Sequence, residues 1–471
     1  MQKYIEKEGL IMSKTTKKVL SLILAIASLG STAILTGCGK NGKVSVTIGD
    51  WPADTDSTAT LYQEYKQEMS EKYPDIELIP DTSNGNATSY VTRAISGQLP
   101  NLYVLSYTEA NNVIKNGFCA DITEACEKYN YAQSLNPLVL DKVKLDGKIY
   151  GIPQTAYALG LACNKEMFEQ AGLVNADGSL QYPQTYDEMI EIAKIIKEKT
   201  GQAGVVFPTM NNQGGWIFTN VAWSYGVDFM EQQEDGKWKA TFDTKECVEA
   251  LQFMKDLKWV HNVLPDNAFV DIDEERKLFA SNQAAMYIIH PTERMLVKNY
   301  SMDKDNICFG RVPAGPAGRY TLMGGNFYAV SPESTPEQIE AIIKFLEIKG
   351  HSPKVAEGME ETSGKGYQKD NEDKVPIMRK PAFPLWVNDE RLELDEKLRA
   401  KYANVPEENF SDYSSFIDVM VHEEEPVCAQ ELYSILDAGI QQVLTEKDAD
   451  CAAVVKRMAE DFQKNHLDNL D

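Results

Sequence analysis

Short apolar runs separated by a helical pattern mark the beginning of the folded chain. Residues 44–48 alternate apolar and polar side chains, which predicts a strand with one buried face. Apolar side chains at helical spacing follow over 61–69, and Pro74 ends that pattern. Further apolar runs at 76–79 and 102–105 predict a second and a third strand. This order of strands and helices predicts an α/β fold with a largely parallel sheet covered by helices.

Later elements are indicated mainly by their end signals. A capping-box sequence at Thr185 predicts the start of a helix that Gly201 ends. The run of prolines and glycines at 313–318 predicts a turn-rich loop, followed by a strand at 320–330. Residues 351–374 are rich in Gly, Ser, Lys and Glu, and we expect them to form a mobile surface loop.

The start of the chain has the pattern of a secretory signal. A basic segment precedes an apolar stretch at 19–29, and small residues then lead to the sequence LTGC at 35–38. This tetrapeptide resembles a bacterial lipobox, in which the cysteine receives a diacylglyceryl group and the signal is cut just before it. Two acyl chains on one residue anchor a protein stably. We expect a signal peptide at 1–37, the lipidated Cys38 with a short tether at 38–43, and a body on the extracytoplasmic face of the cell membrane.

Charge and cysteine usage exclude several other classes of protein. The chain has 47 Lys and Arg against 71 Asp and Glu, a net charge of −24, which argues against a nucleic-acid partner. No CxxC pair occurs among the 8 cysteines, and no two of the 5 histidines have metal-ligand spacing. We therefore expect no metal or cofactor, and free thiols at the cysteines other than Cys38. After the signal, no apolar stretch approaches the roughly 20 residues that cross a bilayer.

Catalytic motifs are weak throughout. His422 and Glu423 begin like a zinc-protease helix motif, but Pro426 occupies the position of the second histidine. Ser224 lies in a loose match to a nucleophile elbow, and its aromatic surroundings favour a helix. Carboxylate pairs are too abundant to indicate a glycosidase. We therefore expect no catalytic residue.

Aromatic, amide and acidic side chains collect instead beside predicted turns and strand ends, where open α/β sheets bind ligands. A sugar ring has apolar faces and a rim of hydroxyls, so it suits a flat aromatic ring surrounded by polar side chains. The aromatic candidates would stack on such a ring and the others would bind hydroxyls, although each aromatic residue could instead be packing. The predicted ligand-binding residues are Trp51, Glu109, Gln154, Tyr157, Trp216, Trp223 and Asn326, with His290 and Trp386 as weaker candidates.

Four blocks of sequence then carry a resemblance that spans most of the chain. They are DGKIYGIP at 146–153 with LACNKEMF at 161–168, PQTYDE at 183–188, FASNQAAM at 279–286, and PAGP at 313–316 with MGGN at 323–326. Together with the lipobox, they resemble the extracellular solute-binding proteins of ABC importers, the large family that includes maltose-binding protein. Asn282 stands where the family pattern has glycine, and Cys163 where an aromatic residue is commoner.

The resemblance implies a two-lobed, type II periplasmic-binding-protein-like fold with discontinuous lobes and a hinge. Lobe 1 would comprise residues 44–152 and 324–388, and lobe 2 residues 153–323 and 389–471. It also implies a monomeric, lipid-anchored, non-enzymatic subunit that closes on a solute and passes it to the permease subunits of an ABC importer. From the aromatic candidates we predict a carbohydrate, and more specifically an oligosaccharide.

Two alternatives remain open at this point. The same fold could bind a peptide, a polyamine or a phosphorylated polyol, although arginine is scarce near the candidate turns and a phosphate group would favour it. The chain could also be a surface carbohydrate-processing enzyme, which predicts two carboxylates facing each other across the cleft.

Overall fold

Parallel strands joined by helices form the first part of the fold, as the apolar pattern predicts. β1 pairs in parallel with β2 and β3, with Val44 opposite Ile76 and Ile48 opposite Leu102. The elements are β1 (Val44–Ile48), α3 (Ala59–Lys72), β2 (Ile76–Pro80), α4 (Ala87–Ile95) and β3 (Leu102–Ser106). The predicted signal peptide and Cys38 lie outside the residues that this computed structural model describes, which are 42–56, 58–82, 87–291, 294–380 and 383–470.

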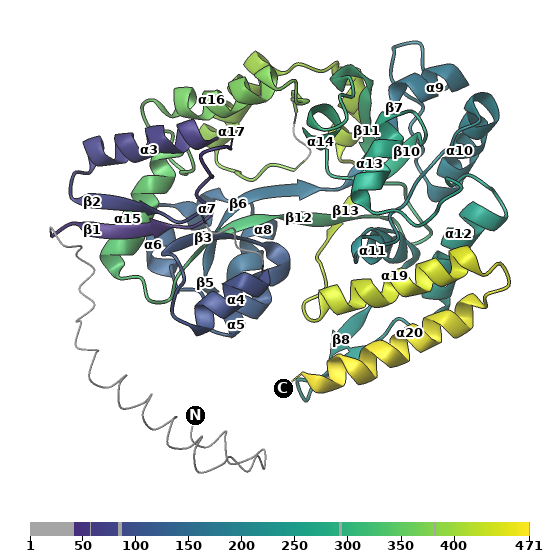
Figure 1. Cartoon of the computed structure of the whole chain (residues 1–471), viewed down its shortest axis with the longest axis horizontal. Coiled ribbons are helices and arrows are strands. Elements are labelled where there is room, and N and C mark those ends of the chain that lie inside the picture. The colour runs from purple at the N-terminus through teal and green to yellow at the C-terminus, as the bar shows by residue number, and fades with distance from the viewer. Residues whose placement is uncertain (1–41, 57, 83–86, 292–293, 381–382, 471) are drawn as a thin grey trace.

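A long strand, β12, joins the two lobes, and a second crossing strand, β6, lies beside it. β6 covers Gly151–Ala158 and β12 covers Arg319–Val330, so the strand predicted at 320–330 is confirmed. The end of β12 pairs antiparallel with β3, and its start pairs in parallel with β13 (Val419–His422). The strand order is β13-β12-β3-β1-β2, with β6 also paired to β12 (Figure 1).

Two consecutive glycines allow the close approach of β6 and β12. Gly325 has a φ of +142°, which L side chains rarely adopt, and an added Cβ would collide with the carbonyl of Thr155. At Gly324 an added Cβ would collide with the ring of Tyr157. These glycines therefore lie where the two crossing strands meet.

Short helices and turns connect β3 to β6 and complete this lobe. They include η1 and α5, which begin directly after β3, and η2, which follows α8. Their bounds are η1 (Tyr107–Glu109), α5 (Ala110–Lys115), α6 (Thr123–Lys128), α7 (Tyr131–Ser134), α8 (Pro137–Leu140), η2 (Asp141–Val143), β4 (Lys144–Leu145), β5 (Lys148–Ile149) and, later in the chain, α15 (Pro336–Ile348).

The second lobe contains a smaller, antiparallel sheet in the order β10-β7-β11. The expectation of a largely parallel sheet is therefore correct for the first lobe and wrong for this one. All residues of β7 and β10 are buried, and strands covered on both faces show no alternation from which a pairing could be inferred. The strands of this sheet are β7 (Gly160–Asn164), β10 (Met286–Ile289) and β11 (Ile307–Arg311). A separate antiparallel pair consists of β8 (Met230–Gln232) and β9 (Trp238–Ala240).

Helices cover this sheet, and the one predicted after Thr185 has the expected ends. The Thr185 hydroxyl accepts a hydrogen bond from the Glu188 backbone N–H at 3.2 Å, and Gly201 ends the helix with a φ of 73°. The helices are α9 (Lys165–Ala171), α10 (Tyr186–Thr200), α11 (Gln213–Tyr225), α12 (Lys245–Trp259), α13 (Ile272–Ala280), α14 (Arg294–Lys298), α19 (Ala429–Thr445) and α20 (Cys451–Asn465).

The two largest hydrophobic cores of the described residues correspond to the two lobes. The first contains buried residues from 46–152 and 323–348, together with Trp386. The second contains buried residues from 159–322 and 432–467. Each lobe is therefore built from segments that are separated in the sequence, which is the two-lobed, discontinuous α/β fold that the resemblance implies.

Residues 351–374 contain a helix, and the prediction of a mobile surface loop for them is wrong. α16 (Met359–Glu372) packs against α17 (Asp389–Tyr402), and Met359 is buried with two leucines of α17. The glycines and charges of α16 give it a low helix propensity, which the packing against α17 overrides. The predicted lobe boundary between 388 and 389 falls between these two packed helices.

α16 also carries ion pairs in two directions. Lys365 pairs with a glutamate of α3 in the first lobe at 2.9 Å. At the other end of the helix, Asp370 pairs with Arg294 of α14 at 2.5 Å, and Asp373 pairs with Lys298 at 2.8 Å. The helix pair α16–α17 therefore bridges the first lobe and α14 at a place separate from the crossing strands (Figure 1).

The cysteines after Cys38 are free thiols, as expected. They are Cys119, Cys126, Cys163, Cys247, Cys308, Cys428 and Cys451. Within the described ranges, no helix combines the length and the apolar character that crossing a membrane requires.

A buried carboxylate positions α11, which supports the site described below. Asp437 of α19 is 5% exposed and accepts hydrogen bonds from the backbone N–H groups of Asn212 at 2.7 Å and Gly215 at 2.6 Å. These N–H groups at the beginning of α11 have no partner within the helix, and a negative charge there is favoured by the helix dipole.

Replacing this carboxylate is expected to destabilise the second lobe. Asp437→Ala leaves the buried Gly215 N–H and the partly buried Asn212 N–H without this acceptor and should lower the free energy of unfolding by about 1.5–3 kcal/mol, measured by urea denaturation. Asp437→Asn retains one acceptor oxygen and should lower it less. Equal stability of the alanine variant and the parent would contradict this assignment.

Candidate functional site

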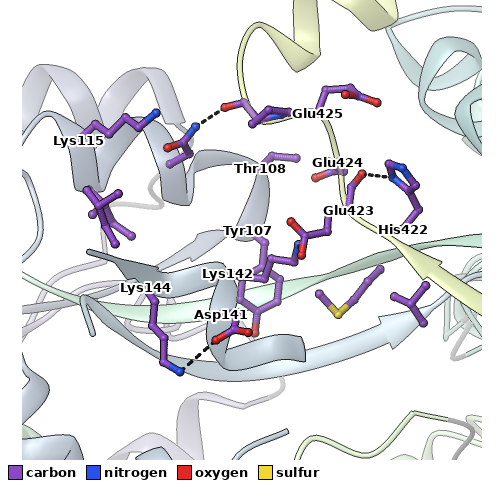
Figure 2. Close-up of a pocket in the computed structure, with 16 residues that line it drawn as sticks. Tyr107, Thr108, Lys115, Asp141, Lys142, Lys144, His422, Glu423, Glu424 and Glu425 are labelled. Carbon is purple, nitrogen blue, oxygen red and sulfur yellow. Dashed lines mark hydrogen bonds and ion pairs between the residues drawn. The ribbon is translucent and has the colours of Figure 1, made fainter. Parts of the chain in front are cut away.

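A pocket of about 550 Å³ opens where two strands approach each other end to end along β12 (Figure 2). β3 runs antiparallel to β12 and β13 runs parallel to it, so their carboxyl ends point toward the same part of β12. We call this the interlobe pocket. Its lining residues are Tyr107, Thr108, Asn111, Ile114, Lys115, Asp141, Lys142, Lys144, Leu145, Met323, Val421, His422, Glu423, Glu424, Glu425 and Pro426.

One wall belongs to the first lobe, and we call its lining residues between 107 and 145 the first-lobe wall. It is formed by η1, α5 and the η2–β4 turn. The Tyr107 hydroxyl donates to the Thr155 carbonyl at 3.0 Å, and its ring stacks on Phe327 with centroids 5.9 Å apart. These contacts hold the beginning of η1 against β6 and β12.

The opposite wall is residues 421–426, which we call the crossing segment. His422 lies flat on Trp223 of α11, with ring centroids 3.9 Å apart and planes at 18°. The Glu424 carboxylate accepts a hydrogen bond from the Trp216 indole N–H at 2.8 Å. The crossing segment is thus packed onto a second-lobe helix by two tryptophans.

Two polar contacts link the walls. The Asn111 side-chain amide donates to the Pro426 carbonyl, and Lys142 forms an ion pair with Glu423. The side chain of Lys142 is 11% exposed, whereas that of Glu423 is 66% exposed. Burial lowers the pKa of Lys142, and the negative charge of Glu423 opposes that shift.

The two partly buried carboxyls of the crossing segment, Glu424 and Glu425, have raised pKa values. Burial raises the pKa of Glu424 to about 7, against the hydrogen bond from Trp216 and the charge of Lys142. Burial raises the pKa of Glu425 to about 8, and the nearby negative charge of Asp228 adds to the shift. A protonated carboxyl both donates and accepts hydrogen bonds, as a sugar hydroxyl does.

His422 has its imidazole Nδ1 2.6 Å from the backbone carbonyl oxygen of Glu423. Burial lowers the pKa of His422, which favours the neutral ring. Together, the pocket offers hydroxyl, amide, imidazole, carboxyl and ammonium groups within one space. Its volume falls in the range of roughly 300–1,000 Å³ that is usual for small-molecule sites. Among the described residues, no group of three or more His, Cys, Asp and Glu side chains could hold a metal ion.

Three of the residues predicted from the sequence adjoin this pocket. Glu109 follows the lining residue Thr108 and is partly buried, and burial raises its pKa. Trp216 and Trp223 lie directly behind the crossing segment, and Trp223 is 2% exposed. Their role as ligand contacts stays a prediction, while the structure shows them supporting Glu424 and His422.

Three further predicted residues lie along the crossing strands. Asn326 of β12 lies opposite both Ser106 and Thr155. Tyr157 of β6 has its ring centroid 5.2 Å from that of His290, a weaker candidate. The Gln154 side chain donates to the Tyr328 hydroxyl at 3.0 Å.

The remaining candidates, Trp51 and Trp386, belong to the first-lobe core. Trp51 is 3% exposed and contacts Tyr62 edge to face, with ring centroids 5.1 Å apart. Trp386 is 7% exposed and packs against Tyr131 and His351. In this structure both rings are therefore covered by protein.

Sequence reasoning missed most of the lining. In the sequence, His422 and Glu423 match only the beginning of a zinc-protease motif, and no pattern singles out Lys142. β13 is four residues long and pairs with a strand that is distant in the sequence. A run of three glutamates before Pro426 was the available signal, although charge runs are usually solvated.

Comparison with known proteins identifies the family of this chain. A model of the bacterial extracellular solute-binding proteins matches residues 52–347. The polygalacturonan/rhamnogalacturonan-binding protein YtcQ of Bacillus subtilis (strain 168) is 22% identical over 322 residues, which are 61% of this chain and 60% of that protein. The match to this relative therefore spans less than two thirds of its length.

Two solved structures share the fold. Maltose-bound MalE3 of T. maritima has a TM-score of 0.63 at 22% identity, covering 89% of this chain and 99% of that chain. UgpB from Mycobacterium tuberculosis, in complex with glycerophosphocholine, has a TM-score of 0.64 at 13% identity, covering 90% and 98%. The family model spans more than half of the chain, and the fold agrees with it, so this chain belongs to the bacterial extracellular solute-binding protein family.

Proposed function

We propose that this chain is the lipid-anchored, solute-capturing subunit of an ABC importer, and that it binds a carbohydrate in the interlobe pocket. The observation that carries the proposal is a pocket with one wall from the first lobe and the other packed onto the second. The names of YtcQ, which binds polygalacturonan and rhamnogalacturonan, and of maltose-bound MalE3 support the carbohydrate class.

The chemistry of the lining suits hydroxyl groups. Thr108, Asn111 and the protonated Glu424 can each donate and accept hydrogen bonds, which is what a ring of alternating hydroxyls requires. No arginine lines this pocket, so the planar fork that suits phosphate is missing from its described lining. A carbohydrate therefore fits the lining better than a phosphodiester such as the ligand of UgpB.

Closure would draw the two walls together around the ligand. β6, β12 and the crossing segment connect the lobes, and the link between Asn111 and Pro426 tightens only when the walls are close. Moving the lobes from 1:99 to 99:1 closed requires about 5.5 kcal/mol of preferential binding to the closed state. A few hydrogen bonds made by both walls can supply this amount.

The predicted anchor at Cys38 is compatible with an unobstructed pocket. β1 begins at the outer end of the first lobe, away from the strands that connect the lobes (Figure 1). A tether that enters β1 there would place the membrane attachment far from the pocket. The captured solute would then be released to permease subunits in the same membrane.

A ligand panel tests the proposed class. The full-length lipoprotein in detergent should show a rise in Tm with an oligosaccharide, and the sugar should be recovered intact. Maltotriose, trigalacturonate, a tripeptide, spermidine and glycerophosphocholine form a suitable panel for differential scanning fluorimetry. A rise in Tm with only the tripeptide, spermidine or glycerophosphocholine would contradict carbohydrate capture. Cleavage of the sugar would indicate an enzyme.

The contact between Asn111 and Pro426 provides a test of closure. Asn111→Ala removes a hydrogen bond between the walls and should weaken carbohydrate binding about 2- to 10-fold by calorimetry. The control is Asn112→Ala, an exposed neighbour whose side chain accepts from Asn116 in the first lobe. Equal weakening by both variants would show that the contact has no particular role.

The buried carboxyls predict a dependence of stability on pH. In the folded chain the pKa of Glu424 is about 7 and that of Glu425 is about 8, whereas the pKa of glutamate in an unfolded chain is about 4.3. The folded chain therefore binds more protons over this interval, so its free energy of unfolding falls as pH rises.

The variant carrying both Glu424→Gln and Glu425→Gln should lose most of this decline between pH 5 and 8.5, measured by urea denaturation. The exposed Glu71→Gln variant serves as a control and should keep it. A parental stability that rises steadily from pH 5 to 8.5, with the same slope in the double variant, would contradict the assignment.

A further inference from the structure

The two walls of the interlobe pocket differ in charge. The first-lobe wall carries Lys115, Lys142 and Lys144 with one acidic residue, Asp141, whereas the crossing segment carries three consecutive glutamates (Figure 2). The chain as a whole carries a net charge of −24, so a wall with three lysines and one aspartate differs locally from its overall character. A local excess of ammonium groups in an acidic protein indicates a requirement for negative charge at that place.

Lys142 is the lysine whose environment most needs an anion. Its side chain is 11% exposed, and burial of an ammonium is costly without a paired negative charge. Glu423 supplies that charge, but its own side chain is 66% exposed and projects from the other wall. The exposed Glu423 carboxylate is readily rehydrated when it leaves, and the cost of its release is the loss of the negative charge that it supplies to Lys142. A ligand carboxylate could therefore take its place.

The other acidic groups of the lining do not prevent this. Asp141 is paired with Lys144 at 3.0 Å, so the two charges largely cancel. Burial raises the pKa of Glu424 to about 7 and that of Glu425 to about 8, so both carboxyls are mostly protonated just below neutral pH. A protonated carboxyl can donate a hydrogen bond to an anion. If Glu423 moved away, the ammonium groups of Lys142 and Lys115 would face the ligand without a paired carboxylate from the pocket lining.

We propose that the carbohydrate captured in the interlobe pocket is an acidic one, an oligomer of uronic acid, and that Lys142 binds one of its carboxylates in place of Glu423. This rests on the proposed function, since it concerns the ligand of the same pocket. Single ammonium groups without an arginine fork suit a carboxylate on a sugar better than a phosphate, which favours bidentate contacts. Glu423 then acts as an internal substitute for the ligand's carboxylate.

A matched pair of ligands isolates the contribution of the carboxylate. Trigalacturonate and its fully methyl-esterified form have the same rings and linkages, and differ in charge. Calorimetry with the full-length lipoprotein in detergent at pH 6.5 should give at least 10-fold tighter binding of the acid, as expected for a charge-assisted contact.

Two substitutions of opposite expected sign assign the effect to this ion pair. Lys142→Met should weaken binding of trigalacturonate at least 10-fold and leave binding of the ester within about 2-fold. Glu423→Gln removes the internal competitor and should tighten binding of the acid. Lys148→Met is a control, because Lys148 is exposed and pairs with Asp121 outside the pocket.

The outcomes separate the two proposals. Equal binding of acid and ester, or weaker binding of the acid in the Glu423→Gln variant, overturns the acidic ligand while carbohydrate capture stands. Absence of binding by the acid, the ester and every neutral sugar of the panel overturns the proposed function itself. Tight binding of a sugar phosphate in place of trigalacturonate, lost in Lys142→Met, would replace the carboxylate with a phosphate.

Discussion

The pairing of β12 with strands of both lobes is the constraint on which the molecule depends. Its last residues complete the first-lobe sheet beside β3, and its first residues pair with β13. Backbone hydrogen bonds must be satisfied along a buried strand, so the two lobes cannot separate along β12 without exposing them. Gly324 and Gly325 lie between these two pairings, where β12 meets β6 without side chains of its own.

The same pairing creates the interlobe pocket. Because β3 and β13 approach the middle of β12 from opposite directions, the chain must leave the sheet at each of their ends. The segments that follow the two strands have polar side chains. They are Tyr107 and Thr108 after β3, and Glu423 to Glu425 after β13. A site with walls from two lobes is therefore a direct consequence of strand direction, and its chemistry is set by which residues occupy two short turns.

Much of the fold could be predicted from the sequence. Alternation and helical spacing identified β1, α3, β2 and β3, and the signals at Thr185 and Gly201 identified α10, because these features act locally. α16 was missed because its helix depends on packing against α17. The antiparallel pairing of β7 was missed because fully buried strands carry no periodic signal.

The site was predictable only in part. Glu109, Trp216 and Trp223 adjoin the pocket, yet the face of the Trp223 ring is covered by His422. Whether an indole is covered or exposed depends on which distant segment packs against it, and residue type alone contains no such information. Lys142 and Glu423 could not be paired from the sequence either, because their proximity exists only after the crossing segment has returned along β12.

The ion pairs at the end of α16 have a consequence for how the lobes move. A body held to another at two separate places keeps one rotation, about the line that joins those places. The crossing strands form one such place, and the contacts of Asp370 and Asp373 with α14 form the other. Partly exposed ion pairs are screened by dissolved ions, whereas a hydrogen-bonded strand is not. Of the two connections, the one at α14 is therefore the one that dissolved ions weaken, and the axis that it defines is the less permanent of the two constraints.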